Sequence, residues 1–189
     1  MIGLKRHTVQ VVGHQRGWAA LAADTCQEVQ LAGGDLLADV QHMGSTAVPG
    51  LPAKPILDLV AGVRTLEAIP ELIGRLTNIG YLYRGDGGVD GRHLFVKESS
   101  PDVRTIHLHV VTYNGQEWRS CLRFRDRLRQ DARIRTQYAE LKRKLGITLQ
   151  NDRKAYTAAK EGFIRAILRG TTPAQPSAGG SAVAPRPGA

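Results

Sequence analysis

Cysteine is scarce in this sequence, with two residues among 189. Cys26 and Cys121 form no Cys-x-x-Cys pair, and neither lies near a histidine at zinc-finger spacing. Both occupy apolar positions of segments with helical periodicity, where a thiol behaves as a small hydrophobic side chain. The sequence therefore favours two buried thiols and argues against a disulfide framework or a zinc-finger fold.

Long apolar runs are also missing. No stretch approaches the roughly 18 apolar residues that are needed to cross a membrane. The N-terminal segment 1–14 lacks the long apolar core and small-residue cleavage site of a secretory signal. We therefore expect a cytoplasmic location without a membrane partner.

Acidic residues are the third shortage, because 17 Asp and Glu stand against 26 Lys and Arg, a net charge of +9. This excess predicts an anionic partner, either a nucleotide, another phosphorylated small molecule or nucleic acid, and solubility alone is the competing explanation. Much of the excess lies in segment 119–169, where Arg119, Arg123 and Arg127 form an i, i+4 stripe. Because this segment lacks interleaved exposed aromatics, we favour a solvated helical surface there over nucleic-acid binding.

Apolar periodicity predicts a mixed fold. Helical spacing runs through residues 17–32, 66–79, 117–130, 131–145 and 151–168, the last with Asn151 or Asp152 as its N-cap. Strand patterns occupy residues 36–42, 55–63, 81–84, 93–97 and 104–113, after an extended lead-in at 8–12. The expected fold class is α/β (α+β), a small mixed sheet with packed helices and a helical C-terminal part. We expect residues 1–169 to form a single domain and the Pro/Gly/Ser/Ala-rich segment 170–189 to be a disordered tail.

One carboxylate interrupts the apolar strand predicted at 55–63. Asp58 is costly there unless it is paired, hydrogen-bonded or bound to a cation. Upstream, Gly44 and Ser45 end the preceding strand in a turn whose backbone N–H groups and hydroxyl can bind phosphate. Asp58 could hold a divalent cation against that phosphate, and Lys54 would add a positive charge. The pattern therefore predicts a phosphate site around Gly44, Ser45, Lys54 and Asp58.

Histidines accompany this carboxylate. His107 and His109 share one face of the strand at 104–113 and, with Asp58, would form a two-His, one-carboxylate set that suits a transition metal better than magnesium. The alternative is a polar pocket whose histidines hydrogen-bond a ligand. His42 ends a strand beside the Gly-Ser turn and is either a hydrogen-bonded support for that loop or a pocket residue that can act as acid or base, and we favour the pocket role. We predict Asp58, His107, His109 and His42 as catalytic candidates, and Asp58, His107 and His109 as ligands of a divalent Mg, Mn or Zn ion.

The segment from His42 to Asp58 resembles the hallmark of the GrpB family, whose fold is nucleotidyltransferase-like. It reads His-Met-Gly-Ser-Thr-Ala-Val-Pro-Gly-Leu-Pro-Ala-Lys-Pro-Ile-Leu-Asp. Similarity continues in order through residues 92–97, 104–110, 118, 124–126 and 152–164, so that it covers about residues 9–168. The resemblance implies a nucleotidyltransferase-type pocket and nucleotide-dependent transfer to a small-molecule acceptor. Because this domain is also fused to dephospho-CoA kinase in some bacteria, the resemblance implies as an alternative a non-catalytic nucleotide- or CoA-binding or folding-helper module.

Two features depart from the nucleotidyltransferase pattern. Val60 stands where active members carry a second acid, and the later strand offers His107 and His109 in place of a third. The missing acids weaken two-metal transfer, which needs several carboxylates, without excluding a single-metal variant. A different reaction class on a specialised small molecule also stays open, because fold alone does not decide function.

Further candidates flank the same strands and the last helix. Arg92 and Arg104 border the two later strands, where they either contact phosphate or keep a strand edge soluble. Tyr156 and Lys160 are four residues apart on the last helix and are therefore neighbours on its surface. We predict these four side chains as substrate-binding residues.

Overall fold

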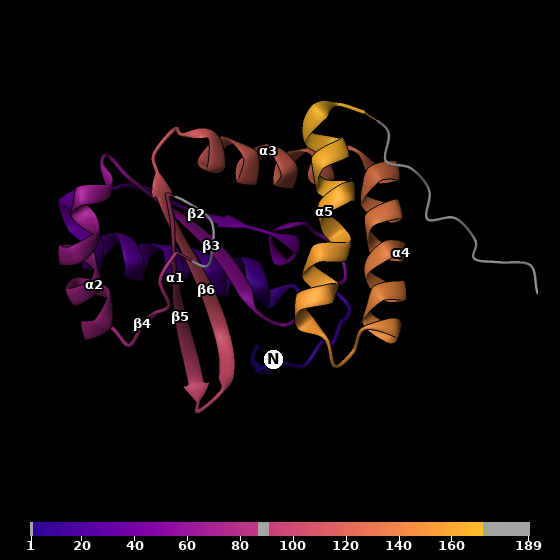
Figure 1. Cartoon of the computed structure of the whole chain (residues 1–189), viewed down its shortest axis with the longest axis horizontal. Coiled ribbons are helices and arrows are strands. Elements are labelled where there is room, and N and C mark those ends of the chain that lie inside the picture. Colours follow the sequence, from indigo (N-terminus) through magenta and orange to yellow (C-terminus); the bar gives the residue numbers. More distant parts are fainter. Residues whose placement is uncertain (1, 87–90, 172–189) are drawn as a thin grey trace, which may run out of the picture.

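The computed structural model describes residues 2–86 and 91–171, and within them it contains a six-stranded mixed sheet (Figure 1). The strand order is β2-β3-β6-β5-β4, and β1 pairs with β6. β3 and β6 run parallel, and the other neighbouring strands are antiparallel. The strands are β1 (Leu4–Lys5), β2 (Leu37–Met43), β3 (Leu57–Val63), β4 (Leu82–Tyr83), β5 (Arg92–Ser100) and β6 (Val103–Thr112). This arrangement confirms the expected α/β (α+β) class.

Helices lie on both faces of this sheet. They are α1 (Gly17–Gly33), α2 (Ile69–Asn78), α3 (Gln116–Gln130), α4 (Ala132–Thr148) and α5 (Arg153–Arg169), with short 3-10 turns at Gly34–Leu36, Ser45–Ala47 and Leu66–Ala68. In Figure 1, α3 crosses the top of the sheet, and α4 and α5 stand side by side at one end of it. None of the described helices is long and apolar enough to cross a membrane.

Side-chain alternation on β3 and β6 separates two apolar layers. Leu57, Leu59, Ile106 and Leu108 face α1 and α2 in the main core. The intervening positions face α3. There Trp118 of α3 packs against Met43, Val60 and Val111, and these four side chains form the second apolar layer. Because strand side chains alternate between faces, Asp58, His107 and His109 also point to the α3 side of the sheet.

A third apolar cluster attaches the C-terminal helices to the loop after the Gly44-Ser45 turn. Val48 and Leu51 of the loop pack against Leu128 of α3 and against Tyr138 and Ala139 of α4. All five side chains are nearly or fully buried. The helical part of the chain therefore packs directly on the loop between β2 and β3.

Most predicted elements are present with small shifts at their ends. The strand predicted at 55–63 begins at Leu57, so Asp58 lies near its start, and the lead-in at 8–12 contributes one bridge, between Val12 and Ala53. The two-residue strand β1 was not predicted. Asp152 is the N-cap of α5, accepting from the Ala155 N–H at 2.9 Å. Residues 87–90, between the strands predicted at 81–84 and 93–97, and residues 172–189 of the predicted tail lie outside the described residues.

Both cysteines are free and partly buried, as the sequence indicates. Burial raises the pKa of each thiol to about 11, and the charge of Asp39 adds to this effect at Cys26. Neither thiol is therefore ionised at neutral pH.

Candidate functional site

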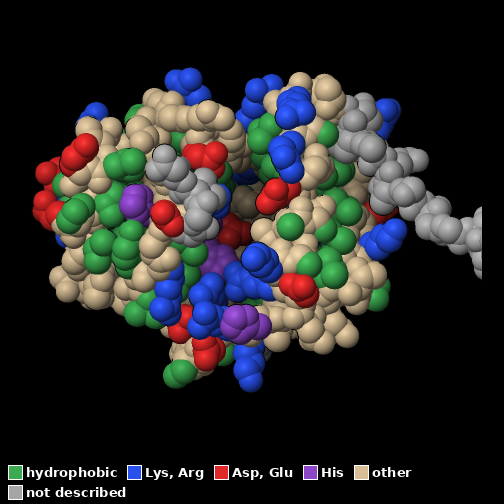
Figure 2. Space-filling view, viewed as in Figure 1, with side chains coloured by type: hydrophobic (Ala, Val, Ile, Leu, Met, Phe, Trp, Pro, Cys, Tyr) green, Lys and Arg blue, Asp and Glu red, His purple; other side chains and the backbone are tan. Residues whose placement is uncertain are grey.

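The molecule is hollowed between the sheet and α5, and His, acidic, Lys and Arg side chains surround the hollow (Figure 2). Hydrogen bonds, ring contacts and charge interactions connect six side chains around Asp58, and we call the space that they share the central cleft: Lys54, Asp58, His107, Arg153, Tyr156 and Lys160. Asp58 of β3 pairs with His107 of β6 in parallel register. Of the Asp58 side-chain surface 34% is exposed, against 10% for His107, so a ligand can reach the carboxylate.

A hydrogen-bonded chain links Asp58 to α5 through His107. The Asp58 Oδ1 to His107 Nδ1 distance is 3.1 Å, and the Arg153 guanidinium lies 3.0 Å from His107 Nε2. Because a guanidinium can only donate, Nε2 accepts and the ring proton of neutral His107 resides on Nδ1, which donates to Asp58. Burial lowers the pKa of His107, in agreement with a neutral ring. Both ring nitrogens of His107 are therefore already engaged.

His109 is held in a similar way by β5. The Arg92 Nε–H donates to His109 Nδ1 at 3.0 Å, which leaves the proton of the neutral ring on Nε2. Burial and the Arg92 charge lower the pKa of His109 to about 3. Arg92 also lies 4.0 Å from Glu117, so its charge is partly balanced within the protein.

Lysines of three different elements surround the carboxylate. Burial lowers the pKa of Lys54 to about 7, of Lys160 to about 8 and of Lys142 to about 6, and repulsion from neighbouring Lys and Arg charges adds to each shift. Lys54 and Lys160 approach the Tyr156 ring from 5.3 and 4.4 Å, a cation–π arrangement that orients both ammonium groups. Lys142 is buried behind them and donates to the Pro52 carbonyl.

The balance of charge in the central cleft is positive. Burial alone would raise the pKa of Asp58, but the hydrogen bond from His107 and the nearby Lys54 charge hold it below its usual range. Asp58 is therefore ionised at neutral pH, and its charge acts on Lys54, Lys160 and Arg153 together. The single negative charge of Asp58 does not neutralise the positive charges around it. The central cleft therefore favours an anionic ligand.

The Gly44-Ser45 turn lies directly against Asp58. Gly44 has φ +69°, and a Cβ there would stand 2.8 Å from Asp58 Oδ2. The Ser45 side chain lies near Tyr138 of α4, where it slightly opposes the rise that burial causes in the pKa of the Tyr138 hydroxyl. The structure thus brings the predicted turn, Lys54 and Asp58 to one place, next to the helical part.

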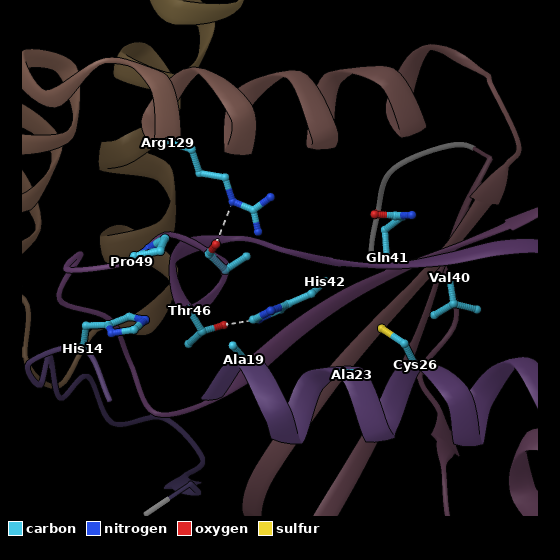
Figure 3. Close-up of a pocket in the computed structure, with 11 residues that line it drawn as sticks. His14, Ala19, Ala23, Cys26, Val40, Gln41, His42, Thr46, Pro49 and Arg129 are labelled. Atoms are coloured by element: carbon cyan, nitrogen blue, oxygen red, sulfur yellow. Dashed lines mark hydrogen bonds between the residues drawn. The ribbon is translucent and has the colours of Figure 1, made fainter. Parts of the chain in front are cut away.

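His42 lies on the other side of the sheet, so the structure does not bring it together with Asp58, and its catalytic role stays a prediction. It pairs with Leu59, whose side chain faces α1, so His42 points to the opposite side of the sheet from Asp58. There it lines a separate cavity of about 370 Å³ between β2 and α1 (Figure 3). His42 Nε2 lies 2.9 Å from Thr46 Oγ1, and burial lowers the pKa of His42 to about 4. Its role here is to support the turn from behind.

Arg104 is also occupied within the protein. Its Nε lies 3.7 Å from Glu98 Oε1, and both side chains are largely buried, with 12% and 14% exposure. Burial lowers the pKa of Arg104, with a further contribution from Arg153. The predicted phosphate contact at Arg104 therefore competes with an ion pair inside the sheet.

The donor set does not fit two hard divalent cations. Val60, two residues after Asp58, is fully buried between Met43, Val111 and Trp118, so an acid there would be covered by α3. The described residues hold no group of three or more His, Cys, Asp or Glu side chains placed to bind a metal ion. Two-metal chemistry needs several carboxylates around both ions. The metal set of Asp58, His107 and His109 stays a prediction.

Sequence reasoning missed two cations of this site. Arg153, Tyr156 and Lys160 stand at i, i+3 and i+7, the spacing of one helix face, which is a signal that identifies Arg153. Lys142 stands four residues after Tyr138 on the buried side of α4, where a lysine is unusual. A basic residue at a position where the helix pattern predicts an apolar one is therefore the sequence signal that could have identified Lys142.

Comparison with known sequences places this geometry in context. The profile of the family described as GrpB protein matches residues 8–170. The glutamate-rich protein GrpB of Alkalihalophilus pseudofirmus is 32% identical over 171 residues, which are 89% of this chain and 98% of that protein. A dephospho-CoA kinase of Mycolicibacterium paratuberculosis is 27% identical over 88% of this chain and 46% of its own length.

Two solved structures share the fold. GrpB from Enterococcus faecalis matches with a TM-score of 0.78 and 32% identity over 85% of this chain and 96% of that chain. Cid1 in complex with its product ApU matches with a TM-score of 0.51 and 12% identity over 69% of this chain and 42% of that chain. The second likeness shows a nucleotidyltransferase-like arrangement of elements and nothing more specific.

Proposed function

This chain belongs to the GrpB family, and we propose that its central cleft binds a phosphorylated small molecule of nucleotide type. The ligand is held by lysine and arginine side chains and not by a pair of metal ions. Nucleotide and CoA both fit this chemical class, since each carries a compact group of phosphates.

The observation that carries the proposal is the surplus of cations around Asp58. Lys54, Lys160 and Arg153 surround it on one side of the sheet, and burial depresses the pKa of each of these cations. A phosphate group among them would restore the charged form of both lysines, so binding and protonation favour each other. Tyr156, buried between the two lysines, keeps them pointed at the same volume.

Nucleotidyl transfer is the second candidate. It is favoured by the contact between the Gly44 turn and the Asp58 carboxylate, because a phosphate-binding turn beside an acid is the arrangement such transfer uses. Against it stand the buried Val60 and the engaged nitrogens of His107. Turnover of a nucleoside triphosphate would therefore have to proceed with fewer carboxylates than the usual two-metal reaction.

Thermal unfolding with added ligands tests the proposal. ATP, CTP, GTP, UTP and CoA are each added with EDTA, magnesium, manganese or zinc, since a ligand that binds the folded state raises Tm. We expect at least one of these compounds to raise Tm in EDTA, and we expect Lys160→Met to reduce that rise. Lys154→Met is the matched control, because Lys154 is an exposed lysine on the same helix.

Two results would overturn the proposal. One is the absence of a Tm rise with every compound under every condition. The other is a rise that Lys160→Met leaves at the wild-type value. Release of pyrophosphate from a triphosphate in the same samples would favour the second candidate function.

A further inference from the structure

Four arginines converge on a groove between α3 and α5, away from the central cleft. The groove has a volume of about 460 Å³ and is lined by Arg119, Arg123, Arg165 and Arg169 together with Gln116, Ser120 and Leu168. We call it the arginine groove. In Figure 2, Lys and Arg side chains gather over the top of the molecule, where Figure 1 places α3 and the end of α5.

Helix geometry explains this convergence. Arg119 and Arg123 are four residues apart on α3, and Arg165 and Arg169 are four apart on α5, so each pair forms a short stripe along its helix. Trp118 of α3 is buried against the sheet, with Cys121 and Leu122 packed around it, which turns the first stripe away from the sheet. The two stripes therefore line the two sides of one groove.

The protein supplies little negative charge to this groove. Arg165 lies 3.4 Å from Glu161, but both side chains are mostly exposed, at 66% and 58%, and such pairs stabilise little. Within residues 2–86 and 91–171, no ion pair is found for Arg119, Arg123 or Arg169 at 4.0 Å or less. Like charges four residues apart on a helix repel each other, and an anion in the groove would remove that repulsion.

We propose that the arginine groove is a second anion site, which binds a compact polyphosphate group. Each guanidinium can donate two parallel hydrogen bonds to phosphate oxygens, and the Gln116 amide and Ser120 hydroxyl can donate as well. The volume falls in the range of about 300–1,000 Å³ that is usual for small-ligand sites. No aromatic side chain lines the groove, which argues against stacked bases and hence against single-stranded nucleic acid.

The arginine groove is separate from the central cleft. Arg169 follows Lys160 by nine residues, which places it about 13 Å further along α5 and on the opposite side of the helix. Lys160 faces Asp58, whereas Arg169 faces α3. A ligand in one site therefore does not occupy the other.

Calorimetric titration with inorganic tripolyphosphate tests this second site. The titrations compare the wild type with the Arg119→Gln/Arg123→Gln double variant, each with and without Lys160→Met so that the central cleft can be subtracted. The control double variant is Arg127→Gln/Arg133→Gln, which removes the same charge from exposed arginines outside the groove. Because the groove variant loses the charge-assisted hydrogen bonds of two guanidinium groups, we expect it to lose about tenfold or more in affinity.

The titration results either support or overturn the arginine groove as a second anion site. A loss of affinity in the groove variant but not in the control, in both Lys160 backgrounds, supports the arginine groove even if the central cleft binds nothing. Equal losses in the groove variant and the control would overturn it, because the effect would then follow net charge alone. Tighter binding of a single-stranded oligouridylate than of tripolyphosphate, lost in the same groove variant, would also overturn it in favour of nucleic acid.

Discussion

At the scale of single residues, the central cleft depends on how closely the Gly44 turn approaches Asp58. Gly44 has a positive φ, and its missing Cβ leaves the space that the Asp58 carboxylate fills. Gly50, in the loop that follows, has φ +76°, but a Cβ at this position would meet no other atom within 4 Å. Both glycines therefore have a positive φ, but of the two only a Cβ at Gly44 would contact Asp58.

Replacement of each glycine by alanine measures the contact. Both substitutions place an alanine at positive φ, but Gly44 also has ψ −163°, a conformation that almost only glycine adopts, so backbone strain of about 1–3 kcal/mol adds there to the contact with Asp58. We expect Gly44→Ala to lower the free energy of unfolding more than Gly50→Ala does, and to weaken ligand binding in the central cleft. Urea denaturation of both variants gives the comparison. Equal losses would show that close approach to Asp58 is not a constraint.

Residue chemistry made part of the site predictable. Asp58 is conspicuous as a charge in an apolar strand, and strand alternation correctly places His107 and His109 on one face. His42 lies next to the turn in sequence but faces the other side of the sheet from Asp58, and this orientation depends on the register between β2 and β3. Register is a property of paired strands, so one strand considered alone does not reveal it.

At the scale of elements, α5 supplies two of the cations near Asp58, Arg153 and Lys160. Its N-cap, Asp152, fixes where the helix begins and so places Arg153 in the first turn, beside His107. The long helices were predictable because their apolar periodicity extends over several turns. β1 was not predicted, and β4 is shorter than the strand predicted at 81–84. Each has only two residues and is defined by its pairing with another strand.

Removal of the N-cap tests this role of α5. We expect Asp152→Ala to cost about 1 kcal/mol of stability, the usual contribution of a cap, and also to weaken binding in the central cleft by displacing Arg153. Asp131→Ala is the matched control, because Asp131 caps α4 through the N–H groups of Arg133 and Ile134. Melting curves and ligand titrations of both variants give the comparison. Similar stability losses with similar binding would contradict a positioning role for the start of α5.

At the scale of the whole molecule, many of the Lys and Arg side chains that make the net charge positive gather at two sites. Some of them surround Asp58, and others line the arginine groove between α3 and α5. The sequence located the excess in the C-terminal third but did not separate these sites, because their separation depends on how α3, α4 and α5 pack together. The division of the basic residues into two sites is therefore a result of tertiary packing, which composition does not reveal.

Buried lysines link stability and binding to pH. The pKa values of Lys54 and Lys160 in the folded protein, about 7 and 8, lie below the usual value of about 10.4 in an unfolded chain. Between these limits the unfolded chain binds more protons, so we expect the free protein to gain stability as pH rises from about 8 to about 10. Thermal unfolding across this range measures the gain.

The same titrations act in the opposite direction on the ligand. An anion favours the protonated lysines, so we expect its affinity to fall as pH rises through about 8. Sulfate, whose charge is constant in this range, serves as the probe in calorimetric titrations. Affinity for sulfate that is independent of pH would contradict the assignment of Lys54 and Lys160 to the central cleft.

The most direct test of the account is the affinity of the central cleft of the Asp58→Asn variant for a nucleoside triphosphate, measured with EDTA and with magnesium. The substitution keeps a side-chain oxygen that can accept from His107, but it removes the negative charge that competes with the ligand for the surrounding cations. If cations hold the ligand, binding persists in EDTA and Asp58→Asn binds it at least as tightly as the wild type. Binding that requires magnesium and disappears in Asp58→Asn would contradict the account and establish Asp58 as a metal ligand.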